Sequence, residues 1–183
     1  MFKINYRIVD DFDLIINNDK KTFDEDPEIE GFFQLKFDNN IEGYYHDKEL
    51  SNGEEGLELL INWFDLLLEV SENLKINNYV AFQIPEIHNR WIELSLLNEN
   101  INASLIKDKE EKEIRPIIIN TPPKMLEYLN WKNIKILKKD FFEEVAENVK
   151  LFVQDLVKLN NKLENSKVLI SFLNRAHDLT DNV

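Results

Sequence analysis

Apolar and polar side chains alternate at the start of the chain, which predicts a β-strand. Between residues 2 and 8 every second side chain is large and apolar, the period-2 pattern of a strand with one covered face. Residues 12–17 form a second apolar run, for which we expect another short strand. Alternation returns at residues 33–37 and again at 41–45. Because Asn tolerates a positive φ, the intervening Asp38-Asn39-Asn40 predicts a hairpin turn.

The most apolar stretch of the chain predicts a long helix from about Asn52 to Leu74. Ser51 and Glu54 have the spacing of a capping box, which marks a helix N-terminus. Apolar side chains cover most of the circumference of this helix, so we expect it to be largely buried. Its remaining polar positions are spaced by four, three, four and three residues, which places them in one stripe. The stripe consists of Glu58, Asn62, Asp65, Glu69 and Glu72.

The middle of the chain predicts an antiparallel meander. Strand patterns occur at residues 79–84, 91–97, 101–106 and 114–119. Pro116 lacks an amide hydrogen, and we therefore expect the last of these strands at the edge of a sheet. In the second strand Trp91 and Ile92 point to opposite faces, so Trp91 is either exposed or covered by a second layer.

The last third of the chain predicts helices. Thr121 and Pro122 indicate a short helix through Leu129. A longer helix is expected from about Asp140 to Leu163, and a final one covers residues 166–178, with Leu169, Phe172, Leu173 and Ala176 turned inward. The packing face of the longer helix comprises Phe142, Val145, Val149, Phe152, Val153, Leu156 and Leu163.

The order of strands followed by helices predicts an α+β fold. We expect an antiparallel sheet of about six to eight strands, packed against a long central helix and the C-terminal helices. The 183 residues suit one domain with one core, so residues 1–183 are predicted to form a single domain. Hydrophobic residues make up 43% of the chain and aromatic residues 11%, which distinguishes it from disordered acidic chains.

Charge is strongly negative and unevenly distributed. The chain carries 22 basic and 35 acidic side chains, a net charge of −13. Residues 1–60 have a net charge of −10, residues 61–120 of −4 and residues 121–183 of +1. Such a field attracts cationic partners and repels phosphate backbones. We therefore expect a basic protein partner and no nucleic acid partner.

Composition excludes several kinds of chemistry. The chain has no cysteine, which excludes disulfides, thiolate nucleophiles and zinc–thiolate sites. Its four glycines do not form a phosphate-binding loop, and no Gly-x-Ser-x-Gly elbow is present. We therefore predict no catalytic residue, no metal ligand and no cofactor. No apolar run is long enough to span a bilayer, and the charged N-terminus is unlike a signal peptide. These features predict a cytoplasmic protein with no membrane partner.

Three segments, together with the acidity and the small size, resemble a known class of proteins. The segments are 60–68 (LINWFDLLL), 90–94 (RWIEL) and 141–145 (FFEEV). The chain looks like the immunity proteins encoded beside bacterial polymorphic or contact-dependent toxins. The resemblance implies a non-enzymatic cytoplasmic protein that neutralises a toxin domain, often a basic one, by tight stoichiometric binding. It assigns no role to any individual residue.

Two acidic segments are the candidate partner-binding surfaces. Carboxylates speed the encounter with a basic partner, and a few desolvated aromatic side chains supply most of the affinity. The first segment is the loop from Asp24 to Glu30 with the neighbouring Phe32, and the second is the polar stripe of the long helix. The candidate residues are Asp24, Glu25, Asp26, Glu28, Glu30, Phe32, Glu58, Asp65, Glu69 and Glu72.

Two other functions stay open at this point. A small hydrolase or metal-dependent enzyme would place carboxylates, such as Asp11 and Asp13, or His88 in a cleft beside the sheet. His88 is a candidate because it lies in a predicted hairpin loop next to Arg90 and Trp91. An acidic mimic of nucleic acid would instead carry carboxylates at phosphate intervals along one elongated face.

Overall fold

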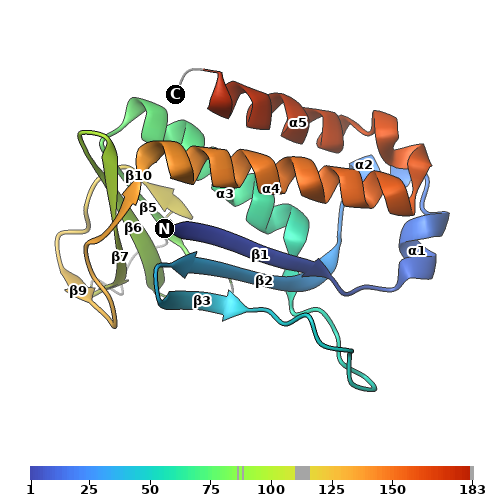
Figure 1. Cartoon of the computed structure of the whole chain (residues 1–183), viewed down its shortest axis with the longest axis horizontal. Coiled ribbons are helices and arrows are strands. Elements are labelled where there is room, and N and C mark those ends of the chain that lie inside the picture. The colour runs from blue at the N-terminus through green and yellow to red at the C-terminus, as the bar shows by residue number, and fades with distance from the viewer. Residues whose placement is uncertain (86, 88, 110–115, 182–183) are drawn as a thin grey trace.

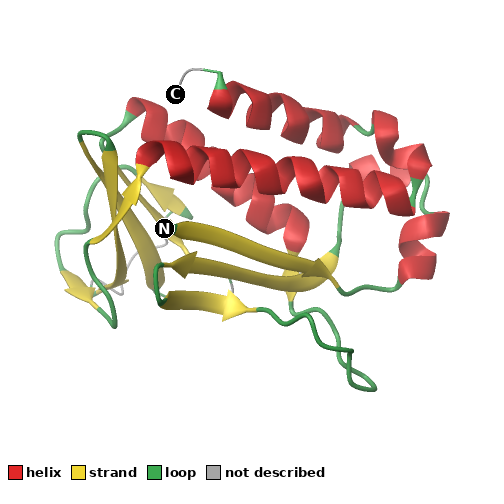
Figure 2. Cartoon of the chain, in the orientation of Figure 1, coloured by secondary structure: helices red, strands yellow, loops and turns green. Residues whose placement is uncertain are grey.

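The protein is described by a computed structural model that covers residues 1–85, 87, 89–109 and 116–181. That part of the chain contains five α-helices and two antiparallel sheets (Figures 1 and 2). The predicted α+β class, with antiparallel strands against a long helix, is confirmed. The strands, however, are divided between two sheets.

The first sheet is built on the N-terminal strands. It contains β1 (Phe2–Ile8), β2 (Glu30–Phe37), β3 (Asn40–Tyr44) and β4 (Glu58–Leu59). The strand order is β1-β2-β3, and β4 also pairs with β2. The predicted hairpin is confirmed by the β2–β3 pairing, and its turn places Asp38 at a φ of 54°.

The second sheet contains the predicted meander. Its central strands are β5 (Tyr79–Gln83), β6 (Arg90–Leu97) and β7 (Asn100–Asp108). The order is β10-β7-β6-β5-β8. The strand predicted at 114–119 is described only as β8, which lies at an edge as predicted, and residues 114–115 of that prediction lie outside the described residues. Trp91 is only 3% exposed and packs with Ala81 and Ile106, which answers the question that its alternation left open. The remaining strands are β8 (Ile118–Ile119), β9 (Leu126–Tyr128) and β10 (Ile134–Leu137).

Two of the three long helices, α3 (Leu60–Ile76) and α4 (Lys138–Leu159), contact the sheets, and the third, α5 (Lys167–Thr180), packs on them. In Figure 1, α4 runs beside β1, α5 lies along α4, and α3 passes behind α4. The short helices α1 (Phe12–Asn17) and α2 (Lys20–Glu25) lie at one end of the molecule, near the C-terminal end of α4.

Aromatic side chains join these layers into one core. Phe64 of α3 lies 5.3 Å from Tyr6 of β1 and 4.6 Å from Phe152 of α4, measured between ring centroids. Phe33 of β2 stacks on Trp63 at 4.7 Å, so Trp63 is a core residue. All seven residues of the packing face predicted for the helix from about Asp140 to Leu163 are buried. The same cluster includes residues of both sheets.

A buried carboxylate connects the two sheets. Glu42 of β3 accepts hydrogen bonds from Arg90 of β6 and from the indole of Trp131, which follows β9. The nearest Glu42–Arg90 distance is 2.9 Å, and Trp131 also stacks on Phe37 with centroids 4.9 Å apart. This contact joins the two sheets, with the Glu42 carboxylate buried and the Arg90 side chain partly exposed.

Three predictions in the first sixty residues are wrong. The loop predicted from Asp24 to Glu30 is shorter, because α2 extends through Glu25 and β2 begins at Glu30. Residues 12–17 form the helix α1 because the Asp11 carboxylate accepts from the amides of Asp13 and Leu14 and thereby caps its N-terminus. The long helix begins at Leu60 and not near Asn52. Glu54 does bond the Ser51 amide, but Gly53 adopts a left-handed conformation with a φ of 79°, which ends the turn.

Three predictions in the C-terminal third also need correction. Residues 121–129 form no helix, and β9 pairs there with β7 instead. The helix expected to reach Leu163 ends at Leu159, because the side chain of Asn160 donates to carbonyls of the α1 region and accepts from the amide of Lys162. Leu173 is 37% exposed and does not turn inward.

Candidate partner-binding surface

Asp24 and Phe32, both expected in the first acidic surface, serve the fold instead. The Asp24 carboxylate accepts from the Ser166 hydroxyl at 2.6 Å and from the Lys167 amide at 2.9 Å, at the start of α5. Burial alone would raise the pKa of Asp24, but these hydrogen bonds outweigh it and lower the pKa. Phe32 is only 2% exposed, which leaves little surface for a partner.

Three other acidic residues of this segment line a pocket. Asp26, Glu28 and Glu30 surround a recess of about 530 Å³ together with Asp10. No Lys or Arg occurs among the described residues that line it. We call this pocket the acidic recess. Its apolar lining consists of Leu14, Ile15, Phe23, Ile29 and Leu163.

The acids of the recess differ in how they are used. Asp10 accepts hydrogen bonds from the amides of Asp11 and Glu30 and so holds the chain at the rim. Asp26, Glu28 and Glu30 make no side-chain hydrogen bond or ion pair within the described part of the chain. Glu25 lies outside the recess and pairs with Lys21 at 3.7 Å on the surface. Three carboxylates are therefore available to a partner.

The helix α1 exposes apolar side chains beside this recess. Phe12 and Ile16 are each 44% exposed and Leu14 is 68% exposed, whereas Ile15 is buried. Successive side chains of an α-helix are rotated by about 100°, so Asp13 points away from the buried Ile15. Phe12 and Ile16 lie on one flank of the helix, and Leu14 lies on the other. We call Phe12, Leu14 and Ile16 the α1 ridge. One of its flanks lines the acidic recess through Leu14.

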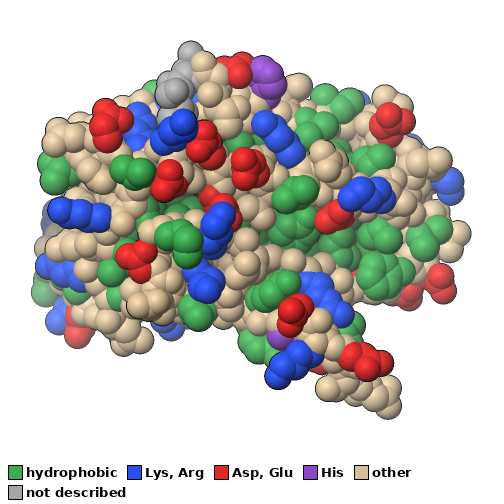
Figure 3. Space-filling model, viewed as in Figure 1, with side chains coloured by type: hydrophobic (Ala, Val, Ile, Leu, Met, Phe, Trp, Pro, Cys, Tyr) green, Lys and Arg blue, Asp and Glu red, His purple; other side chains and the backbone are tan. Residues whose placement is uncertain are grey.

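The other flank of the ridge borders a second hollow. Phe12, Tyr6, Ile8 and Leu159 contribute to a space of about 550 Å³. In Figure 3, apolar side chains gather on this face near the ends of β1 and α4. The lining of this second hollow also includes Arg7, Asp155 and Lys158. The acidic recess and the second hollow therefore lie on the two sides of one exposed helix.

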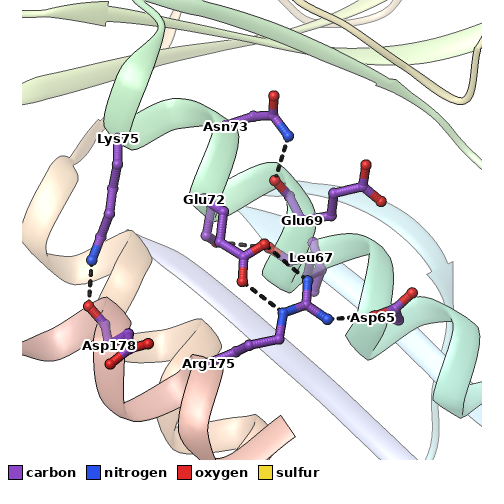
Figure 4. A network of polar contacts seen from close by, with 9 residues as sticks. Asp65, Leu67, Glu69, Glu72, Asn73, Lys75, Arg175 and Asp178 are labelled. Atoms are coloured by element: carbon purple, nitrogen blue, oxygen red, sulfur yellow. Dashed lines mark hydrogen bonds and ion pairs between the residues drawn. The ribbon is translucent and has the colours of Figure 1, made fainter. Parts of the chain in front are cut away.

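The second acidic surface, the polar stripe, is largely tied up by contacts with the protein itself. Figure 4 shows Arg175 of α5 between Asp65 and Glu72 of α3, with bonds of 2.5 Å to Asp65 and 2.6 Å to Glu72. Burial alone would lower the pKa of Arg175, but these carboxylates outweigh it and raise the pKa. Glu58 lies before the helix and accepts from the Trp63 indole at 2.6 Å.

Among the acidic residues of the stripe, Glu69 makes no such contact with another described residue. Its carboxylate points away from Arg175 in Figure 4 and makes no ion pair with another described residue. It lines a hollow of about 440 Å³ together with Asp65, Ile84 and Ile117. This hollow carries fewer available carboxylates than the acidic recess.

The described residues bring together no metal site. No three His, Asp or Glu side chains among them are placed to hold an ion, and Asp11 acts as the cap of α1. His46 pairs with Glu54 at 2.7 Å and His177 with Asp181 at 2.7 Å. His88, the histidine of the enzyme hypothesis, lies outside the described residues. None of the helices in the described ranges has the length and apolar character to cross a membrane.

The sequence predicted three acids of the recess, Asp26, Glu28 and Glu30, but neither Asp10 nor the α1 ridge. Its apolar side chains were assigned to a strand, in which they would have packed inward. The available signal was Asp11, a preferred N-cap residue directly before the apolar run. The chain matches no family model, no curated protein and no solved structure. Function must therefore be argued from this surface.

Proposed function

We propose that this protein is a non-enzymatic, cytoplasmic binding protein of the immunity type, which neutralises a basic toxin domain. The partner binds at the end of the molecule that carries the α1 ridge and the acidic recess. The observation that carries the proposal is the exposure of three apolar side chains on one short helix beside three unpaired carboxylates.

The chemistry of this surface matches that of a protein interface. Apolar side chains gain free energy when a partner removes them from water, and they form the centre of most interfaces. Charged groups around such a centre steer the approaching partner and favour one that carries the opposite charge. Here the charged groups are acidic, which favours a partner rich in Lys and Arg. No observation on the described residues favours a hydrolase, a metal enzyme or a nucleic-acid mimic. Binding of a basic protein is therefore the function that we propose.

Co-expression with a toxin tests this function. We expect the C-terminal domain of the protein encoded immediately upstream to arrest growth when it is expressed alone, and this chain to restore growth. A triple variant, D26N/E28Q/E30Q, should fail to restore it. The matched control E99Q/E147Q/D178N removes the same charge from exposed positions elsewhere and should still restore growth.

The same experiment has outcomes that contradict the proposal. If the wild-type chain leaves growth arrested, the protein is not the antidote to that toxin. If both triple variants lose protection equally, the general negative charge and not the acidic recess is responsible. Thermal unfolding of each variant, followed by circular dichroism, establishes that it is folded before growth is compared.

A further inference from the structure

We infer that the acidic recess receives a short arginine-bearing segment of the partner, whose apolar neighbours pack on the α1 ridge. This inference rests on the proposed function and specifies the chemistry of the occupant. It follows from the size of the recess, the chemistry of its walls and the position of the ridge.

The recess is too large for a single side chain. Its volume of about 530 Å³ falls in the range of pockets that enclose whole small molecules. A segment that inserts one long side chain together with part of a neighbouring residue would fill it. The recess lies at the surface beside α1 and α2, so a folded partner has access to it.

The walls of the recess match the two parts of an arginine side chain. The apolar residues Phe23, Ile29 and Leu163 offer a surface for the aliphatic stem. The carboxylates of Asp26, Glu28 and Glu30 offer acceptors for the guanidinium group, which has five N–H donors and bonds more than one carboxylate oxygen at once. These carboxylates have no cation of their own nearby in the recess lining.

The α1 ridge favours a macromolecule over a small polycation. Leu14 borders the recess, but Phe12 and Ile16 lie on the opposite flank of the helix. A free polyamine in the recess would leave those two side chains in water. A polypeptide with apolar residues on both sides of its arginine covers the recess and the ridge together.

Charge argues against the other macromolecular occupants. A second copy of this chain brings a net charge of −13, and anionic lipid head groups or nucleic acids also present negative charge to the same carboxylates. Each of these partners would bring negative charges against the carboxylates of the recess, where little water remains to screen the repulsion. A basic polypeptide is the occupant whose charge complements the surface.

Titration of the full-length protein with a model peptide tests the inference. The probe is the peptide acetyl-Gly-Leu-Arg-Leu-Gly-amide, followed by NMR of the ¹⁵N-labelled protein. We expect shifts at the amides of Leu14, Ile15, Phe23 and Glu30. Replacement of arginine by citrulline, which keeps the shape and removes the charge, should weaken binding at least about tenfold, or roughly 1.4 kcal/mol. Lysine should bind more weakly than arginine.

Variants separate the recess from the general field of the protein. D26N/E28Q/E30Q should lower the affinity for the arginine peptide about tenfold or more. E99Q/E147Q/D178N should change this affinity by less than about twofold. L14A removes only apolar contact at the border of the recess. It should therefore lower the affinities for the arginine and citrulline peptides by the same factor.

Several results would overturn the inference. These are no amide shifts near α1 at millimolar peptide, shifts centred on Glu69 instead, equal weakening by both triple variants, or spermidine binding the recess more tightly than the peptide. Growth rescue that depends on the recess, combined with failure of the arginine peptide, would refute the inference and leave the proposed function standing. Absence of rescue by the wild-type chain would refute the function itself.

Discussion

At the scale of single residues, the structure separates carboxylates that hold the fold from those that make no bond within the described part of the chain. Asp24 was expected in the acidic surface, yet it accepts from Ser166, 142 positions later in the chain. A contact of that sequence separation leaves no local pattern. Glu28, four residues away from Asp24, has no such bond and lines the recess. Only the three-dimensional arrangement distinguishes the two.

We expect Asp24→Asn to destabilise the protein at neutral pH. The carboxylate caps α5 together with Ser166, and loss of a helix cap typically costs about 1 kcal/mol in free energy of unfolding. Because folding lowers the pKa of Asp24, its contribution is present above the pKa of the unfolded chain, near 3.8. That contribution is lost as the pH falls through the lower folded value. Urea unfolding at several pH values measures it.

The neighbouring Glu25→Gln is the matched control for this prediction. Glu25 has only an exposed ion pair at 3.7 Å, so its substitution should change stability by less than about 0.5 kcal/mol. The difference in free energy of unfolding between Asp24→Asn and the wild-type protein should disappear in acid. An equal gap at pH 7 and at about pH 2 would show that the charge on Asp24 contributes nothing.

At the scale of elements, periodicity predicted the strands better than the helix ends. The alternation in β1 and the turn at Asp38 were sufficient to predict β1 and the β2–β3 hairpin. In β3, however, the covered side chain is Glu42, and the apolar Ile41 is exposed. The six-residue run of α1 is too short for periodicity to separate helix from strand. The contact that joins the two sheets is made by Glu42, Arg90 and Trp131, which lie far apart in sequence.

Substitution of Glu42 tests the contact between the sheets. Glu42→Gln keeps an acceptor for the Trp131 indole but leaves the half-buried Arg90 without its counter-charge. Removal of one partner from a buried ion pair costs about 3–5 kcal/mol, and partial exposure of Arg90 places the expected loss near 2 kcal/mol. Urea unfolding followed by tryptophan fluorescence measures this loss.

The exposed pair between Lys109 and Glu127, at 3.3 Å, supplies the comparison for Glu42. Both residues of this pair are about half exposed, so Glu127→Gln should cost less than about 1 kcal/mol. If the Glu42 and Glu127 variants are equally stable, the contact between the sheets is not a stabilising element of the fold.

At the scale of the whole molecule, stability and recognition make opposite demands on the acidic end. A net charge of −13 repels itself in the compact state. The structure offsets part of this charge with internal pairs, such as Arg175 with Asp65 and Glu72. It leaves Asp26, Glu28 and Glu30 close together without a cation. Carboxylates placed in this way lower stability unless a basic partner is bound.

This opposition predicts how stability depends on salt. Because the Debye length falls to about 10 Å at 0.1 M salt, NaCl between about 0.01 and 0.3 M should raise the melting temperature of the wild-type chain. At low salt D26N/E28Q/E30Q should melt above wild type and respond less to NaCl, whereas E99Q/E147Q/D178N, whose acids lie apart, should respond nearly as wild type does. Differential scanning calorimetry distinguishes these cases. If the recess variant melts below wild type at low salt, its carboxylates stabilise the free protein, and the argument that they are reserved for a basic partner fails.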